Sequence, residues 1–391
     1  MKKRILFLFA LVLLLCVCCF CSSAEEENRI VVDHVVYQLI PASEQTEAYY
    51  IVVKLFDSEE AKAGVKKIVI PSQIDGIPVT KIYCEDSYTD PYRSLTVKKI
   101  VLPDSIQVIG EKAFIHMLSL REINIPPSVV SIGPFAFSGC KKLKQITIPE
   151  SVETIEECAF RDCHPLEQVC FLGNGLKRIE RQAFYKCRNL KSIRFPSSLE
   201  TIGDEAFSHS GLNTVRISGN CIVKWCAFEY NNSLKKVVFE DRTDENDMFI
   251  QSYAFGYCSK LEKVYLPKES VGFNLLACVF EGCGKLKAVY RTDHIQSIGY
   301  HTFYLCKSLT SFTVPAEIQS IHRFAFSDCT GLKKLRVLAT DPAFLTAESK
   351  SAAFLKKPPT DCKVYVKTAE MKQALLNAGC KNKVIVKADL K

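Results

Sequence analysis

The sequence predicts an α/β repeat solenoid, in which short parallel strands line one face and short helical turns line the other. Two observations predict it: a phenylalanine that returns at a nearly fixed interval, and a run of alternating apolar residues after each phenylalanine. With 48% hydrophobic and 24% charged residues, the 391-residue chain has enough apolar surface to fold. A period of this length is typical of repeats that bury their apolar faces against one another.

The period is set by a phenylalanine that usually follows an alanine. Ten such phenylalanines are spaced 23, 23, 24, 23, 21, 27, 25, 23 and 23 residues apart. We expect each ring to fill the core between adjacent coils, while the alanine permits close approach. The ten are Phe114, Phe137, Phe160, Phe184, Phe207, Phe228, Phe255, Phe280, Phe303 and Phe326.

The rest of the repeat is clearest between Ser128 and Pro149. It reads Ser-Val-Val-Ser-Ile-Gly-x-x-Ala-Phe-x-x-Cys-x-x-Leu-x-x-Ile-x-Ile-Pro. The spacing of Leu143, Ile146 and Ile148 predicts a short strand with one buried face. The proline ends this strand because it lacks an N–H for the ladder. The Ile-Gly step predicts a turn with positive φ, and the Ala-Phe segment a single short helical turn.

This unit resembles the leucine-rich repeat of the BspA type, which occurs in secreted and surface proteins of bacteria and of some protozoa. The resemblance covers residues 65–340 and implies about ten to twelve coils of 23 residues. Residues 69–82 are similar to the entry repeat of that family, whereas residues 221–250 depart from the pattern. The family implies a secreted or cell-surface binding protein that mediates adhesion or interaction with host proteins or glycans.

The first 24 residues are typical of a secretory signal peptide. Three basic residues precede the apolar residues 5–20, and small residues up to Ala24 form a cleavage site. We therefore expect secretion or a cell-surface location, with no membrane span in the mature chain, because a spanning helix needs about 20 apolar residues. Lipid attachment to one of the leader's four cysteines is the alternative, although the residues before them are not small.

Atypical units are expected at both ends, because a terminal coil otherwise exposes its apolar face. Residues 25–64 contain apolar runs that predict an N-terminal cap of paired strands. Residues 341–391 predict a degenerate repeat and a capping helix, with Thr368 as N-cap and Gly379 as C-cap.

Seven of the fifteen cysteines in the mature chain occupy one repeat position, three residues after the phenylalanine. Buried thiols that pack under the turn explain this column, and disulfides between adjacent coils are the alternative. The cysteine and histidine spacings do not match a zinc motif, so no metal site is predicted. The column comprises Cys140, Cys163, Cys187, Cys258, Cys283, Cys306 and Cys329.

Composition and motifs also argue against catalysis and nucleic-acid binding. The chain has no Gly-x-Ser-x-Gly elbow, no His-Glu-x-x-His and no phosphate-binding loop, so we predict a protein that is not an enzyme and needs no cofactor. An active site within residues 221–250 is the alternative, without positive support. Net charge falls from +8 to about +5 without the leader, too mild for a nucleic-acid footprint.

Function is therefore expected on the outward positions of the strands. Cations and tyrosines gather there in the later coils, and aromatic residues beside cations are favoured at recognition sites. We hypothesise that this stripe binds an acidic glycan or protein segment. The alternatives are that β-propensity alone places these residues, and that the protein is a structural envelope spacer without a specific ligand. The candidate binding residues are Arg194, Arg216, Lys236, Lys263, Tyr265 and Tyr290.

Overall fold

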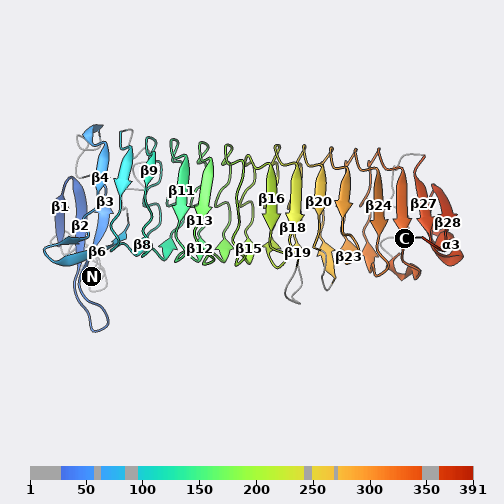
Figure 1. Ribbon diagram of the computed structural model, residues 1–391, viewed down its shortest axis with the longest axis horizontal. Helices are drawn as coiled ribbons and strands as arrows, with labels where there is room; N and C mark the ends of the chain where they lie inside the picture. Colours follow the sequence, from blue (N-terminus) through green and yellow to red (C-terminus); the bar gives the residue numbers. More distant parts are fainter. Residues whose placement is uncertain are drawn as a thin grey trace, which may run out of the picture.

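The computed structural model describes residues 28–56, 63–83, 96–241, 249–267, 272–345 and 361–390. The coils stack into an elongated body, with the first strands at one tip and the last strands at the other (Figure 1). Strands of successive coils pair in parallel, in two rows that follow the length of the body. The predicted repeat solenoid is confirmed, whereas the predicted signal peptide lies outside the described residues.

Most of the strands predicted after the phenylalanines form one of these rows, here called the broad ladder. The strand predicted after Phe184 does not form, and that coil contributes only an isolated bridge at Ser192. The broad ladder is divided into four separate parallel sheets. In β11, Ile146 and Ile148 are buried whereas Gln145 and Thr147 are exposed, as the alternation predicts. The strands are β4 (Lys67–Val69), β7 (Lys99–Val101), β9 (Glu122–Ile123), β11 (Gln145–Ile148), β13 (Gln168–Phe171), β16 (Thr214–Ile217), β18 (Lys236–Phe239), β20 (Lys263–Tyr265), β22 (Ala288–Tyr290), β24 (Ser311–Val314), β26 (Lys334–Val337), β27 (Lys363–Val366) and β28 (Lys383–Val386).

A second row, here called the narrow ladder, was not predicted. Its strands lie just before the turn, and most of them are only two residues long, which is too short for periodicity to reveal. With the N-terminal strands they form a 15-stranded sheet. They are β8 (Val108–Ile109), β10 (Ser131–Ile132), β12 (Thr154–Ile155), β14 (Arg178–Ile179), β15 (Thr201–Ile202), β17 (Ile222–Val223), β19 (Phe249–Ile250), β21 (Phe273–Leu275), β23 (Ile295–Ile298) and β25 (Ser320–Ile321).

The N-terminal residues extend the narrow ladder with antiparallel strands. β1 (Arg29–Val32) pairs with β2 (Val35–Ile40), which pairs with β3 (Tyr49–Lys54). β3 then lies parallel to β6 (Ile77–Ile82), which also pairs with the short β5 (Gln73–Ile74). Strands thus form where the sequence predicts them, and their role as a cap stays a prediction.

The C-terminal residues contain the 3-10 helix η2 (Pro342–Phe344) and the helix α3 (Ala369–Asn377). The Thr368 side chain accepts a hydrogen bond from the Met371 amide at 3.1 Å, so the predicted N-cap is confirmed. Gly379 lies just beyond the C-cap residue, with a φ of 86°. The helix packs against β27 and β28. Across the described segments, no helix combines the length and apolar character that a membrane crossing requires.

The Ala-Phe segments form consecutive β-turns and not the predicted helical turn. Around Phe137, hydrogen bonds join Ala136 N to Gly133 O at 3.2 Å and Ser138 N to Phe135 O at 3.0 Å. Phe135 has a φ of 55°, which interrupts a right-handed helix. All ten turns have positive φ at the residue before the alanine position and at the second residue after the phenylalanine. The body is therefore built of strands and turns with little helix, and the α/β description needs this correction.

The glycine of the Ile-Gly step is needed for space and not for backbone conformation. Gly203 and Gly299 do not have positive φ, so that prediction is wrong. A Cβ atom at Gly203 would lie 2.7 Å from the carbonyl carbon of Glu180 in the preceding coil. At Gly299 the same atom would lie 2.5 Å from that of Leu276. Glycine thus permits the close approach of adjacent coils.

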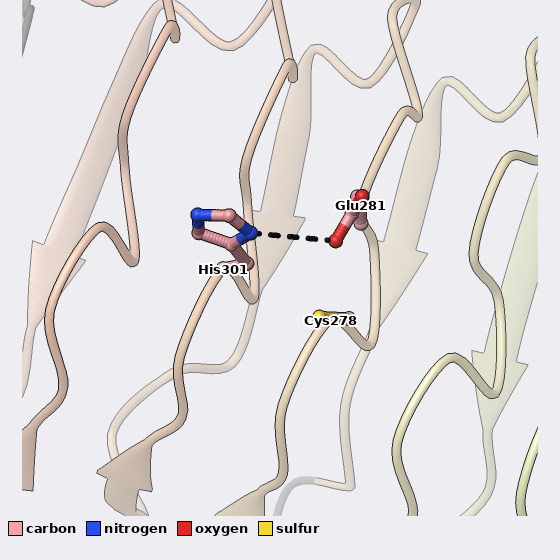
Figure 2. Close-up of side chains that lie close together, drawn as sticks. All are labelled: Cys278, Glu281 and His301. Atoms are coloured by element: carbon pink, nitrogen blue, oxygen red, sulfur yellow. Dashed lines mark ion pairs between the residues drawn. The ribbon is translucent and has the colours of Figure 1, made fainter.

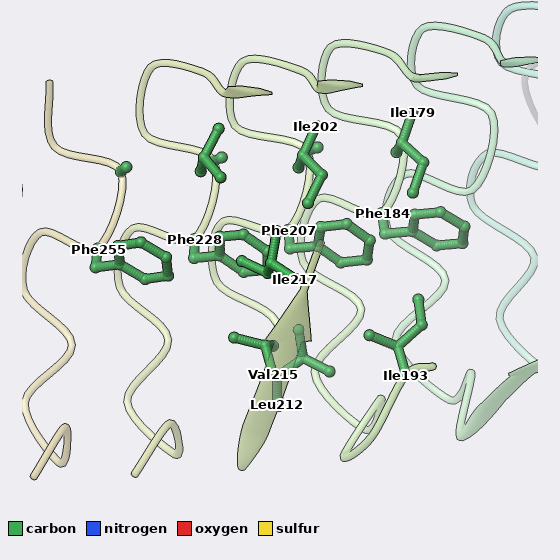
Figure 3. Packing of buried hydrophobic residues seen from close by; sticks show 14 of the residues in the cluster. Ile179, Phe184, Ile193, Ile202, Phe207, Leu212, Val215, Ile217, Phe228 and Phe255 are labelled. Carbon is green, nitrogen blue, oxygen red and sulfur yellow. The ribbon is translucent and has the colours of Figure 1, made fainter. Parts of the chain in front are cut away.

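The phenylalanine rings form a continuous row through the core. All ten are fully buried, and the centroids of successive rings lie 5.1–5.8 Å apart. Figure 3 shows the row between Ile202 of the narrow ladder and Val215 of the broad ladder. The backbone reinforces it, because the Phe137 amide donates to the Ala159 carbonyl of the next coil at 2.7 Å.

The cysteine column satisfies the carbonyl groups of this row. Each of the seven thiols is buried and donates to the phenylalanine carbonyl of the preceding coil, at 2.9–3.3 Å. Where Asn231 takes the position, its Nδ2 donates to the Phe207 carbonyl at 2.7 Å. Burial raises the pKa of Cys258 to about 12, which keeps the thiol protonated as a donor. This geometry supports the interpretation as packing thiols.

The ring row predicts a large effect of truncating one ring. We expect Phe207→Ala to lower the free energy of unfolding by about 3–5 kcal/mol, because it leaves a cavity between two coils. Val130→Ala, at a side chain that is 56% exposed, should change it by less than about 0.5 kcal/mol. Urea unfolding followed by circular dichroism measures both, and similar losses would contradict the central role of the row.

The thiol column predicts selective alkylation. In the native protein, iodoacetamide should label the exposed Cys170, whereas the seven column thiols should react only after denaturation. Peptide mass spectrometry reads each site separately. Column cysteines that resist labelling in denaturant until a reductant is added would instead establish disulfides.

Candidate binding surface

The broad ladder is interrupted between β13 and β16. Among the described strands, β13 pairs only with β11, and the coil after it contributes a single isolated bridge to β16. An open groove of about 1210 Å³ lies at this interruption. It is lined by the half-buried rings of Phe171 and Phe195 and by the exposed side chains of Arg194 and Arg216.

The loop after β13 shapes one end of the groove. Gly173 has a φ of 62°, and a Cβ atom at Gly175 would lie 1.6 Å from the Glu150 carbonyl oxygen. Only glycine therefore lets the loop pass this closely over the preceding coil. Asn174, which also lines the groove, accepts a hydrogen bond from the Ser197 hydroxyl at 3.2 Å.

The neighbouring sheet carries the other candidate residues. Arg216, Tyr265 and Tyr290 lie in one row of paired positions across β16, β18, β20 and β22. The two tyrosine rings stack with centroids 4.6 Å apart. Lys236 and Lys263 are directly opposite each other, and the Lys236 Nζ lies 4.9 Å from the centroid of the Tyr265 ring. The structure thus brings five of the six candidate residues together on one sheet beside the groove, whereas Arg194 lies in the groove itself.

Positive charge predominates on this surface, although the Glu240 carboxylate also lines the groove. Considering the described residues only, the side chains of Arg194, Arg216 and Lys263 form no ion pair. In an earlier coil the Lys99 ammonium lies 2.8 Å from the Glu122 carboxylate, and this hydrogen bond lowers the pKa of Glu122. Like charges directly opposite on paired strands destabilise a sheet, so stability alone does not favour two facing lysines.

All six candidate residues therefore occupy the groove or the sheet beside it, but the groove itself was not predicted. The repeat pattern assigns Phe171 and Phe195 to the buried face of their strands, and both rings remain half-exposed. One feature of the sequence indicates that the repeat is irregular at the groove. Leu172 and Gly173 stand where most coils have the proline that ends the strand.

The two ladders, the ring row and the exposed strand face define a leucine-rich repeat protein. The sequence matches the BspA type Leucine rich repeat region, in 6 copies, over residues 89–174, 170–276 and 248–346. Because these matches cover more than half of the chain, the protein belongs to the BspA-type leucine-rich repeat family.

Solved structures share this fold. A leucine-rich repeat protein from Bacteroides ovatus ATCC 8483 is 20% identical, with a TM-score of 0.56 over 92% of this chain and 99% of that chain. The pneumococcal vaccine antigen PcpA is 18% identical, with a TM-score of 0.50 over 92% of this chain and 98% of that chain. At these identities the likeness is one of fold. A comparison with proteins of curated function found no significant match.

Proposed function

We propose that the protein binds an acidic protein partner through the groove and the adjoining sheet of the broad ladder, in an adhesion or surface-contact role. The observation that carries this proposal is a set of cations, Arg194, Arg216 and Lys263, that form no ion pair with any described residue and lie near the stacked rings of Tyr265 and Tyr290. Such a surface attracts carboxylates over long range and offers rigid aromatic contact area at short range.

The groove favours a polypeptide over a saccharide. Its half-buried rings, Phe171 and Phe195, offer an apolar floor for a side chain of the partner. The backbone of β13 lacks a ladder partner on the groove side among the described residues, so its amide and carbonyl groups can meet those of an extended segment. Arg194 and Arg216 both line the groove, where they can pair with acidic side chains.

We propose that this binding takes place outside the cytoplasm. The support is the sequence of the first 24 residues, with its basic start, apolar core and small residues before Ala24. A secreted location also suits the thiol column, because burial and hydrogen bonding protect those thiols from an oxidising environment.

Binding can be measured with an array of immobilised peptides in which the number of Asp and Glu residues varies, beside an array of sulfated and carboxylated glycans. We expect saturable binding to the acidic peptides that weakens as salt rises. The double variant Arg194→Glu/Arg216→Glu should weaken it at least about tenfold, and Tyr265→Ala or Tyr290→Ala should cost about 1–2 kcal/mol each.

The matched control is Lys307→Glu/Arg323→Glu, which makes the same charge change at exposed positions outside the broad ladder. It should bind as the wild type does. Binding to glycans alone would overturn the choice of a protein partner. An absence of saturable binding on both arrays would instead favour the spacer role, and equal losses in both double variants would point to net charge alone.

The leader predicts a defined mature N-terminus. We expect the protein isolated from the medium or the cell surface to begin at Glu25, because small residues precede that bond. Mass spectrometry of the N-terminal peptide measures this. A lipid-modified cysteine at the mature N-terminus would establish membrane anchoring, and an intact leader would contradict secretion by this route.

A further inference from the structure

On the turn side of the body, the residue before the alanine position lies beside its equivalent in the next coil. Cys278 and His301 occupy this position in consecutive coils, and Glu281 follows Cys278 by three residues. Figure 2 shows the three side chains converging between the two coils. Their Sγ, carboxylate oxygen and ring nitrogen all lie within 4.8 Å of one another. His301 Nδ1 is 3.7 Å from Glu281 Oε2.

The carboxylate of this cluster is buried and only half satisfied. Glu281 is 6% exposed and Cys278 is 4% exposed. The Tyr257 hydroxyl donates to Glu281 Oε1 at 2.5 Å, whereas Oε2 has no hydrogen-bond partner among the described residues. A buried carboxylate oxygen without a donor is costly, and the His301 nitrogen is too distant to supply a hydrogen bond. A cation between these groups would remove this cost.

We propose that Cys278, Glu281 and His301 bind a zinc ion. The set of one thiolate, one imidazole and one carboxylate suits Zn²⁺, which accepts sulfur, nitrogen and oxygen ligands. Zinc bonds of about 2.0–2.3 Å in tetrahedral geometry place ligand atoms roughly 3.3–3.6 Å apart, close to the separation of His301 and Glu281. Three protein ligands leave a fourth position for water or another small ligand.

The neighbouring side chains hold these groups in place. Tyr257 fixes the carboxylate through Oε1, which leaves Oε2 directed into the cluster. The His301 ring stacks on Tyr300 and Tyr304, with centroids 3.9 Å and 4.3 Å away. Such supporting contacts orient the ligands of metal sites.

The chain contains a matched site that lacks the histidine. Cys226 and Glu229 repeat the Cys-x-x-Glu pattern at the same positions two coils earlier, and Tyr253 stands where the later site has His301. Since the repeat tolerates tyrosine at this position, His301→Tyr is expected to fold. Cys226→Ser is the control for the loss of one cysteine at the equivalent place.

The test uses the full mature chain, freed of metal by a chelator and titrated with Zn²⁺ by calorimetry. We expect one ion per chain in the wild type and in Cys226→Ser, and no specific binding in Cys278→Ser or His301→Tyr. Co²⁺ in place of Zn²⁺ should give a thiolate charge-transfer band that disappears in Cys278→Ser. Zn²⁺ should also raise the melting temperature of the wild type but not that of His301→Tyr.

Tyr257→Phe tests the supporting contact, and it should weaken zinc affinity by about 10- to 100-fold. Circular dichroism of each variant without metal checks that the fold is kept. A wild type that binds no stoichiometric Zn²⁺ would overturn the site. So would unchanged Zn²⁺ binding in both Cys278→Ser and His301→Tyr, because the ion would then lie elsewhere. Zinc binding at this cluster does not involve the broad ladder. A negative result in these experiments would therefore leave the proposed binding of a protein partner untouched.

Discussion

The spacing between coils is the constraint on which the structure depends. It is set by the row of buried phenylalanines, whose rings lie 5.1–5.8 Å apart, and by the backbone amides of the ring residues from Phe114 to Phe303, which donate to the next coil. Both interactions need the backbones to approach closely, and this explains the glycines that would otherwise clash with the preceding coil. Because the spacing is uniform, each repeat position places equivalent side chains side by side along the body.

This juxtaposition gives the same residue type different roles at different positions. At the position of Cys163, a thiol meets a backbone carbonyl and donates to it at 3.1 Å, so the whole column acts as structural donors. At the position of Cys278, the thiol meets the side chains of Glu281 and His301 and can act as a ligand. The partner supplied by the adjacent coil, and not the cysteine itself, decides the chemistry.

The two sides of the body separate the two proposed sites. On the broad ladder, side chains between the buried positions are free to vary, and in the later coils they gather cations and stacked tyrosines. The interruption of the ladder after β13 adds a deep groove to this surface. On the turn side, positive φ at each turn places side chains of neighbouring coils against one another. The two proposals therefore rest on different faces of the body and can be tested independently.

The sequence by itself determined the repeat, the ring row, the strands of the broad ladder, the N-cap Thr368 and the residues of the outward stripe. These follow from local patterns, because periodicity reports which side chains face the core. Only the tertiary structure decided the narrow ladder, the turns in place of helices, the groove and the cluster of Cys278, Glu281 and His301. Two-residue strands carry no period, and positive φ at non-glycine residues depends on hydrogen bonds to the next coil. Contacts between coils join residues about 23 positions apart. The repeat period shows which positions are equivalent, but it does not show which side chains of neighbouring coils touch.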